Sequence, residues 1–70
     1  MKLSDIQVGD IVHERCGDSS PVTECGTVEG VPIYNLSACW DDNLCDIDGD
    51  IREDINKVTR EGEVIWEREA

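Results

Sequence analysis

The segment with the clearest strand pattern is Ile33-Tyr34-Asn35-Leu36-Ser37-Ala38-Cys39-Trp40. Apolar residues occupy every second position, and the polar residues Asn35 and Ser37 lie between them. This alternation is typical of an antiparallel strand that buries one face. The sequence therefore predicts a half-buried strand over residues 33–40, with one face formed by Tyr34, Leu36, Ala38 and Trp40.

Turn-forming residues separate this segment from other short stretches with strand character. We expect further strands over residues 11–16, 27–31, 44–47, 57–60 and 63–67. Asp41-Asp42-Asn43 predicts a tight turn, because Asx side chains bond to the nearby backbone and tolerate positive φ. The spacing of Ile51, Ile55 and Val58 predicts one helical or 3-10 turn over residues 52–56. Glu61-Gly62 predicts the turn of a closing hairpin.

Five or six short strands in a chain of 70 residues indicate an all-β fold. Such a small sheet covers its edges most simply by curling into a barrel. We expect residues 1–70 to form one domain, in which residues 61–70 are a C-terminal strand extension. A chain of this length buries only about 60% of the surface that its unfolded form exposes, so a deep, dry catalytic cleft is difficult to build.

Four short motifs resemble those of SH3-like small barrels of the Tudor and KOW type. They are Val8-Gly9-Asp10-Ile11-Val12, Gly26-Thr27-Val28, Ala38-Cys39-Trp40-Asp41-Asp42-Asn43 and Glu53-Asp54-Ile55-Asn56-Lys57-Val58. The resemblance covers about residues 6–60. It implies a barrel of five or six strands, with one 3-10 turn before the last core strand. The chain departs from the pattern at Asn43, where the turn usually has glycine, in the loop between Cys16 and Cys25, and after residue 60.

The acidic balance of the chain favours some partners and disfavours others. Seventeen acidic and six basic side chains give a formal net charge of −11. Phosphate backbones and anionic membranes repel such a chain, so we expect no direct nucleic-acid binding and no membrane binding. A protein with a basic surface is the favoured partner, and solubility alone is the alternative explanation of the charge. The densest region is residues 41–54, with seven carboxylates against Arg52 alone.

Targeting segments and catalytic motifs are absent from the sequence. There is no apolar run long enough to span a membrane and no signal peptide, so we expect a cytoplasmic protein. We also expect the chain to be a monomer. His13 is the single histidine and has no identifiable catalytic partner. Asp46, Asp48 and Asp50 do not begin an EF-hand, because the required glycine and glutamate are missing. We therefore expect no enzyme, no catalytic residue and no cofactor.

Cys16, Cys25, Cys39 and Cys45 leave three alternatives open. No two of them have the C-x₂-C spacing of a zinc knuckle, so no metal ligand is predicted. Cys16 and Cys25 bracket one loop, and Cys39 and Cys45 bracket one hairpin, so each pair could still meet in a zinc site or a disulfide. In a cytosolic chain, reduced and partly buried thiols are the more common state.

These features together indicate a small, acidic, non-enzymatic module that binds a protein. The expected partner-binding residues are Trp40, Asp41, Asp42, Asp46, Asp48, Asp50, Asp54 and Trp66. Trp66 is expected to be an exposed anchor, or else to cap the open end of the barrel. One alternative function is inhibition of a DNA- or RNA-binding enzyme by nucleic-acid mimicry, as in some phage and mobile-element proteins. Another is a structural domain stabilised by a metal bound to the cysteines.

Overall fold

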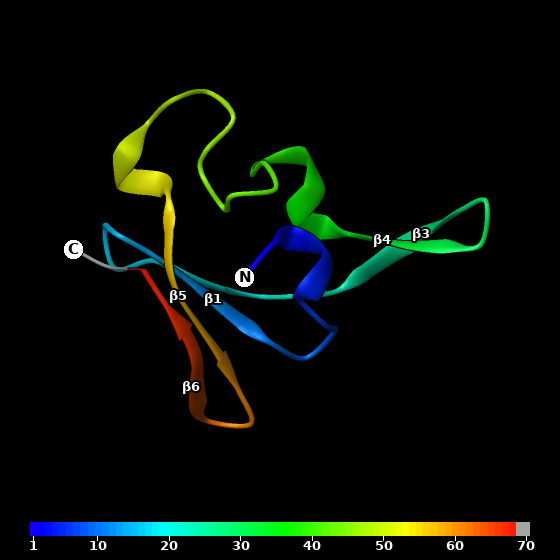
Figure 1. Cartoon of the computed structure of the whole chain (residues 1–70), viewed down its shortest axis with the longest axis horizontal. Coiled ribbons are helices and arrows are strands. Elements are labelled where there is room, and N and C mark those ends of the chain that lie inside the picture. The colour runs from blue at the N-terminus through cyan, green and yellow to red at the C-terminus, as the bar shows by residue number, and fades with distance from the viewer. Residues whose placement is uncertain (69–70) are drawn as a thin grey trace.

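The computed structural model describes residues 1–68, which form two antiparallel sheets (Figure 1). The four-stranded sheet has the order β2-β1-β5-β6, formed by β1 (Ile11–Glu14), β2 (Ser19–Pro21), β5 (Ile55–Arg60) and β6 (Glu63–Glu67). The other sheet pairs β3 (Glu24–Val28) with β4 (Val31–Tyr34). The 3-10 turns are η1 (Leu3–Asp5), η2 (Asn35–Ala38) and η3 (Ile51–Glu53). None of the helical turns in this part of the chain is long and apolar enough to cross a membrane.

One small core joins strands, turns and loops. Its buried apolar residues are Ile6, Val12, Val22, Leu36, Leu44, Ile55 and Val58. Leu3, Tyr34, Trp40 and Trp66 are partly buried and pack against this core. Several of these residues lie outside the strands, so the core depends on the loops as much as on the sheets.

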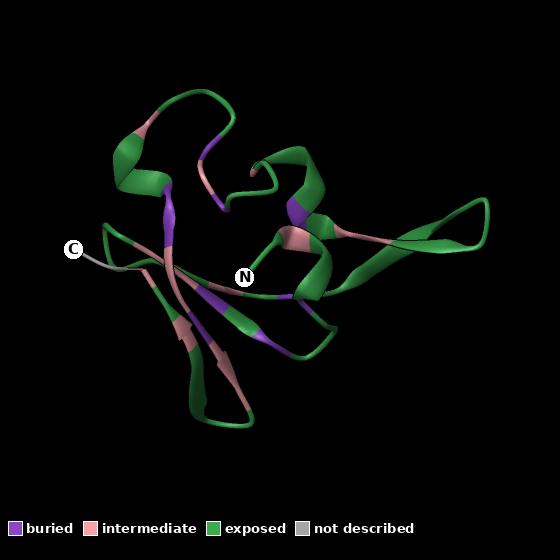
Figure 2. Ribbon diagram, viewed as in Figure 1, coloured by how far each residue is buried: buried purple, intermediate pink, exposed green. Residues whose placement is uncertain are grey.

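The β3–β4 hairpin projects away from the four-stranded sheet (Figure 1). All five residues of β3 are exposed, and Figure 2 shows exposure over most of the hairpin. Asn35 fixes its base, because its side chain accepts from Thr23 N–H at 3.0 Å and donates to Pro21 O at 3.2 Å. No ladder joins the two sheets in residues 1–68. The all-β class with six short antiparallel strands is confirmed, and closure into a barrel is not observed.

The strand predicted over residues 33–40 is wrong beyond Tyr34, because η2 begins at Asn35. Short polar side chains compete here with the strand ladder. Asn35 bonds to the segment before β3, and the Ser37 hydroxyl donates to Tyr34 O at 3.0 Å. Leu36 is still buried, so one position of the predicted apolar face reaches the core without a strand.

The strand predicted over residues 44–47 is also wrong. The only pairing there is an isolated bridge between Trp40 and Asp46. The predicted turn after Trp40 does form, because Asp41 Oδ1 accepts from Asn43 N–H at 2.8 Å and from Cys45 N–H at 3.1 Å. Leu44 then adopts a left-handed φ of 63° and is fully buried, so the chain enters the core instead of extending.

Two hairpins have the same Glu-Gly turn. Glu29 and Gly30 have φ values of 53° and 81° and divide the single strand predicted over residues 27–31, which is therefore wrong. Glu61 and Gly62 have φ values of 53° and 83°, as type I′ turns require, and confirm the predicted closing hairpin. The 3-10 turn predicted over residues 52–56 forms as η3, which begins one residue earlier and ends at Glu53, because residues 55 and 56 belong to β5. In the predicted extension over residues 61–70, β6 forms, and residues 69 and 70 lie outside the described residues.

The left-handed backbone at Glu61 predicts a stabilising substitution. Asparagine tolerates positive φ better than glutamate and is favoured before glycine in a type I′ turn. We expect Glu61→Asn to raise the free energy of unfolding by about 0.5–1 kcal/mol, measured by urea denaturation. Glu61→Gln is the control, because it removes the same charge without this backbone preference. Equal stabilisation by both variants would attribute the gain to charge and contradict the prediction.

Asp10 and Arg60 form a partly buried ion pair that ties the N-terminal segment to the end of β5. Asp10 is 1% exposed, and its two oxygens accept from Arg60 Nε at 2.8 Å and Nη2 at 2.9 Å. Asp10 Oδ2 also accepts from Gln7 N–H at 2.9 Å. The hydrogen bonds from Arg60 lower the pKa of Asp10, although burial opposes this shift. The charged form of Asp10 therefore stabilises the fold.

We expect Asp10→Asn to lower the free energy of unfolding at pH 7 by about 1–3 kcal/mol, because it weakens a charge-assisted contact. Since the folded-state pKa lies below the ordinary value of 3.8, this stabilisation is complete above 3.8 and is lost as the pH falls through the folded-state pKa. Urea titrations from pH 7 to pH 3 should show that the gap in free energy of unfolding between the wild type and the variant narrows as the pH falls. Asp48→Asn is the control, and a gap that stays constant with pH would refute this account.

Candidate functional site

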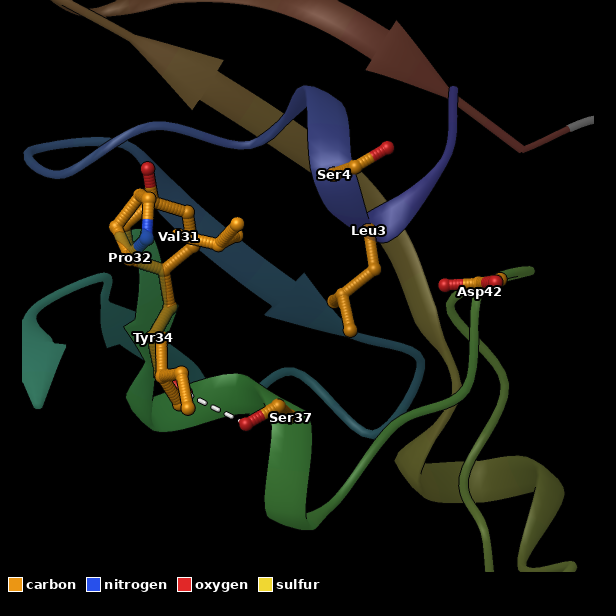
Figure 3. A pocket seen from close by; sticks show the side chains of 8 residues that line it. Leu3, Ser4, Val31, Pro32, Tyr34, Ser37 and Asp42 are labelled. Carbon is orange, nitrogen blue, oxygen red and sulfur yellow. Dashed lines mark hydrogen bonds between the residues drawn. The ribbon is translucent and has the colours of Figure 1, made fainter. Parts of the chain in front are cut away.

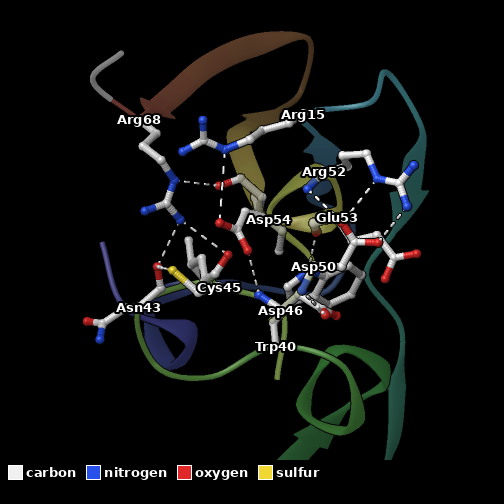
Figure 4. A network of polar contacts seen from close by, with 12 residues as sticks. Arg15, Trp40, Asn43, Cys45, Asp46, Asp50, Arg52, Glu53, Asp54 and Arg68 are labelled. Atoms are coloured by element: carbon white, nitrogen blue, oxygen red, sulfur yellow. Dashed lines mark hydrogen bonds and ion pairs between the residues drawn. The ribbon is translucent and has the colours of Figure 1, made fainter. Parts of the chain in front are cut away.

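Residues 41–54 are held together largely by their own carboxylates (Figure 4). Asp46 Oδ2 accepts from the N–H groups of Asp48 and Asp50, both at 3.1 Å. Asp54 Oδ1 accepts from Asp46 N–H at 2.8 Å, and Asp46 and Asp54 are each only 8% exposed. The carboxylates of Asp46 and Asp54 therefore accept backbone hydrogen bonds that a neighbouring strand would otherwise accept.

The predicted partner-binding carboxylates fall into two groups. Asp50 caps η3 by accepting from Arg52 N–H at 3.0 Å, and it also pairs with the Arg52 guanidinium. Asp41, Asp46, Asp50 and Asp54 therefore all accept backbone hydrogen bonds within this loop. The Asp42 and Asp48 side chains are exposed and accept no hydrogen bond from residues 1–68. These two are free to contact a partner.

Neither predicted tryptophan is fully exposed. Trp40 is half-buried, and its Nε1–H donates to Glu53 O at 2.7 Å. Trp66, expected to be an exposed anchor, is half-buried instead and packs against the core. The Arg68 guanidinium carbon lies 5.2 Å from the centre of the Trp66 ring, and Arg68 also donates to Asn43 O at 2.9 Å. Trp40 thus holds η3 to the segment that follows η2, and Arg68, which lies over Trp66, connects Asn43 to the end of β6.

The turn between β1 and β2 lies against η3. Arg15 N–H donates to Asp54 O, and Cys16 N–H donates to Arg52 O, both at 3.0 Å. This contact brings acidic residues from separate parts of the sequence near one another. We call Glu14, Asp18, Asp46, Asp50 and Glu53 the acidic cluster. Sequence analysis missed Glu14 and Asp18, because their proximity to η3 depends on a backbone contact that leaves no pattern in the sequence.

The acidic cluster has an excess of negative charge. Burial raises the pKa of Glu14, and Asp18, Glu53, Asp46 and Asp50 raise it further. The pKa of Glu53 is raised above all by the charge of Asp46. Arg52 pairs with Asp50, and Arg15 Nε lies 4.0 Å from Asp54, which is outside the cluster, so these two cations compensate only part of the cluster's charge.

One group of side chains brings three atoms of metal-ligand type close together. One oxygen each from Glu14 and Asp18 and the Cys16 sulfur lie within 4.8 Å of one another. This group was not predicted from the sequence, where Cys25 was only a possible partner of Cys16, although the regular spacing Glu14-x-Cys16-x-Asp18 was a signal. All four cysteines have free thiols, and within residues 1–68 no group of three ligands contains two cysteines.

A pocket of about 420 Å³ lies between η1 and β4 (Figure 3). Its lining residues are Leu3, Ser4, Val31, Pro32, Ile33, Tyr34, Ser37 and Asp42. Of the predicted site residues, Asp42 alone lines it. Sequence analysis predicted no such pocket, because its walls come from three separate segments and exist only where the β3–β4 hairpin turns away from the sheet.

Comparison with known proteins finds no match to a family model, a curated protein or a solved structure.

The raised pKa of Glu14 predicts a substitution that stabilises the fold near neutral pH. A carboxyl group with a raised folded-state pKa binds its proton more tightly in the folded chain, so its ionisation lowers stability as the pH rises past its ordinary value of 4.5. We therefore expect Glu14→Gln to raise the melting temperature at pH 7 but not at pH 3.5. Glu63→Gln, an exposed change on β6, is the control. A gain that persists unchanged at pH 3.5 would rule out the ionisation of Glu14 as its cause.

Proposed function

We propose that this protein is a non-enzymatic binding module that engages a protein with a basic surface. The acidic cluster and the exposed carboxylates of residues 41–54 form its contact surface. The observation that supports this proposal is the raised pKa of Glu14 and Glu53 beside neighbouring carboxylates. A partner's lysine or arginine side chains would relieve the repulsion between these carboxylates, and the negative field of the surface would accelerate the approach of the partner.

Three exposed carboxylates are best suited to direct contact. The side chains of Asp18, Asp48 and Glu53 are solvent-exposed, and none of the three carboxylates accepts a hydrogen bond from a backbone N–H of residues 1–68. The buried Asp46 and Asp54 contribute charge from beneath and hold the loop in place. Binding and folding can therefore be tested with different residues.

The SH3-like resemblance of residues 6–60 belongs to the same proposal. What supports it is the set of six antiparallel strands and the position of η3 directly before β5. We infer that the chain is a variant of such a barrel in which the β3–β4 hairpin is turned outward. Small barrels of this kind serve many functions, so the resemblance supports the fold more than any one partner.

Charge reversal tests the proposed surface. We expect the triple variant Asp18→Lys, Asp48→Lys and Glu53→Lys to bind a nine-residue arginine peptide at least about tenfold more weakly in low salt, measured by isothermal titration calorimetry. The matched control reverses Glu29, Glu61 and Glu63, which are exposed at the tips of the two Glu-Gly hairpins. Both triple variants have the same net charge, so equal weakening would show that no specific surface is involved.

Affinity capture followed by mass spectrometry then identifies the natural partner. The proposal requires a protein that the wild type and the control variant retain and the Asp18, Asp48 and Glu53 variant loses. Duplex DNA added in excess tests the alternative of nucleic-acid mimicry. A mimic and DNA compete for the same basic groove, so DNA should displace the captured protein only if the chain is a mimic. A captured protein that is unaffected by the triple reversal would contradict the proposed surface.

A further inference from the structure

The pocket between η1 and β4 has walls of two kinds (Figure 3). Leu3, Val31 and Tyr34 make much of it apolar, and Asp42 adds a carboxylate. Leu3 and Tyr34 pack against the core, and Leu3 N–H donates to Asp42 O at 3.3 Å, which joins η1 to the loop. Its volume of about 420 Å³ lies toward the lower end of the typical range for ligand pockets, roughly 300–1,000 Å³. That size suits a short peptide segment.

The charge of the pocket selects a cationic occupant. Asp42 is exposed and forms no ion pair within residues 1–68, where the arginines that pair do so with Asp10, Asp50 and Asp54. Asp42 also belongs to the acidic loop over residues 41–54, so the negative surface continues to the pocket. An apolar wall beside an unpaired carboxylate fits an apolar side chain next to a lysine or arginine.

The free edge of β4 is poorly suited to pairing with a strand from a partner. Proline in a sheet is confined to edge strands, with its missing N–H on the open side, and Pro32 lies within β4. The free edge of β4 therefore lacks a donor that an added strand would need. Val31 is 63% exposed at the wall of the pocket, which favours recognition through side chains.

We propose that this pocket docks a short segment of a basic protein, with an apolar side chain between Leu3 and Val31 and an adjacent lysine or arginine paired with Asp42. This inference rests on the proposed function and adds the chemistry of the segment that the partner presents. The acidic cluster attracts the partner, and the pocket selects which of its basic segments binds.

Three blocked peptides titrated into the ¹⁵N-labelled full chain test the docking. The first has one leucine between two arginines in a glycine-serine frame; the second replaces the leucine by alanine, and the third replaces both arginines by glutamine. We expect the first peptide to shift the amide signals of Val31, Ser37 and Asp42. It should bind about tenfold more tightly than the second, because burial of the leucine side chain stabilises the complex.

Two protein variants locate the contacts. We expect Val31→Ser to remove the preference for leucine over alanine, and Asp42→Asn to weaken the first peptide about two- to fivefold. Val64→Ser and Glu63→Gln are matched controls on β6, where both residues are exposed, and they should change neither affinity. Amide spectra confirm that each variant keeps the fold.

The possible outcomes separate this inference from the proposed function. If the first two peptides bind equally and shift only residues 14–18 and 46–53, the pocket proposal fails and the proposed function stands. If the glutamine peptide binds as tightly as the first, the role of Asp42 is wrong and the pocket is a plain apolar site. If neither arginine peptide binds in low salt, both proposals fail.

Discussion

Hydrogen bonds from backbone N–H groups to carboxylates organise residues 41–54, and the rest of the structure depends on them. Asp41, Asp46 and Asp54 accept from N–H groups that have no strand partner. A backbone donor buried without a partner costs free energy comparable to a lost hydrogen bond. These contacts allow the loop to turn sharply and to place Leu44 in the core at a left-handed φ of 63°. Leu44 belongs to the small core against which both tryptophans pack.

The same carboxylates also produce the charge of the surface. A backbone N–H group is neutral, so it satisfies the carboxylate oxygen without cancelling its charge. Asp46 illustrates this, because it orders the loop and also raises the pKa of Glu53. The acidity of this region is therefore first a consequence of how the loop folds, and only then the basis of the proposed binding. Substitution of Asp46 would change fold and charge together, whereas substitution of Asp48 changes charge alone.

Parts of the fold were predictable because their signals are local. The Glu61-Gly62 turn and the alternating residues beside it specify the β5–β6 hairpin. The spacing of Ile51, Ile55 and Val58 indicated a 3-10 turn in this region, although Ile55 and Val58 themselves lie in β5. The alternation over residues 33–40 was misleading, because Leu36 can be buried by a continuous strand or, as here, by a strand that ends at Tyr34 and is followed by η2. The candidate site was only half predictable. Net charge identified residues 41–54, but the approach of Glu14 and Asp18 depends on hydrogen bonds from the β1–β2 turn to η3.

The size of the chain connects the core to the proposed binding surface. A short chain has few interior positions, and within residues 1–68 they are filled by seven apolar residues and three aspartates. The valines of the β3–β4 hairpin remain outside, with Val28 58% and Val31 63% exposed. An isolated two-stranded hairpin is only marginally stable in water, so contact with another surface would stabilise it. A partner that is basic and locally apolar meets both needs at once, since it covers Val31 while it compensates the charge of Asp42. The limited core thus gives a physical reason for a binding surface beside the hairpin.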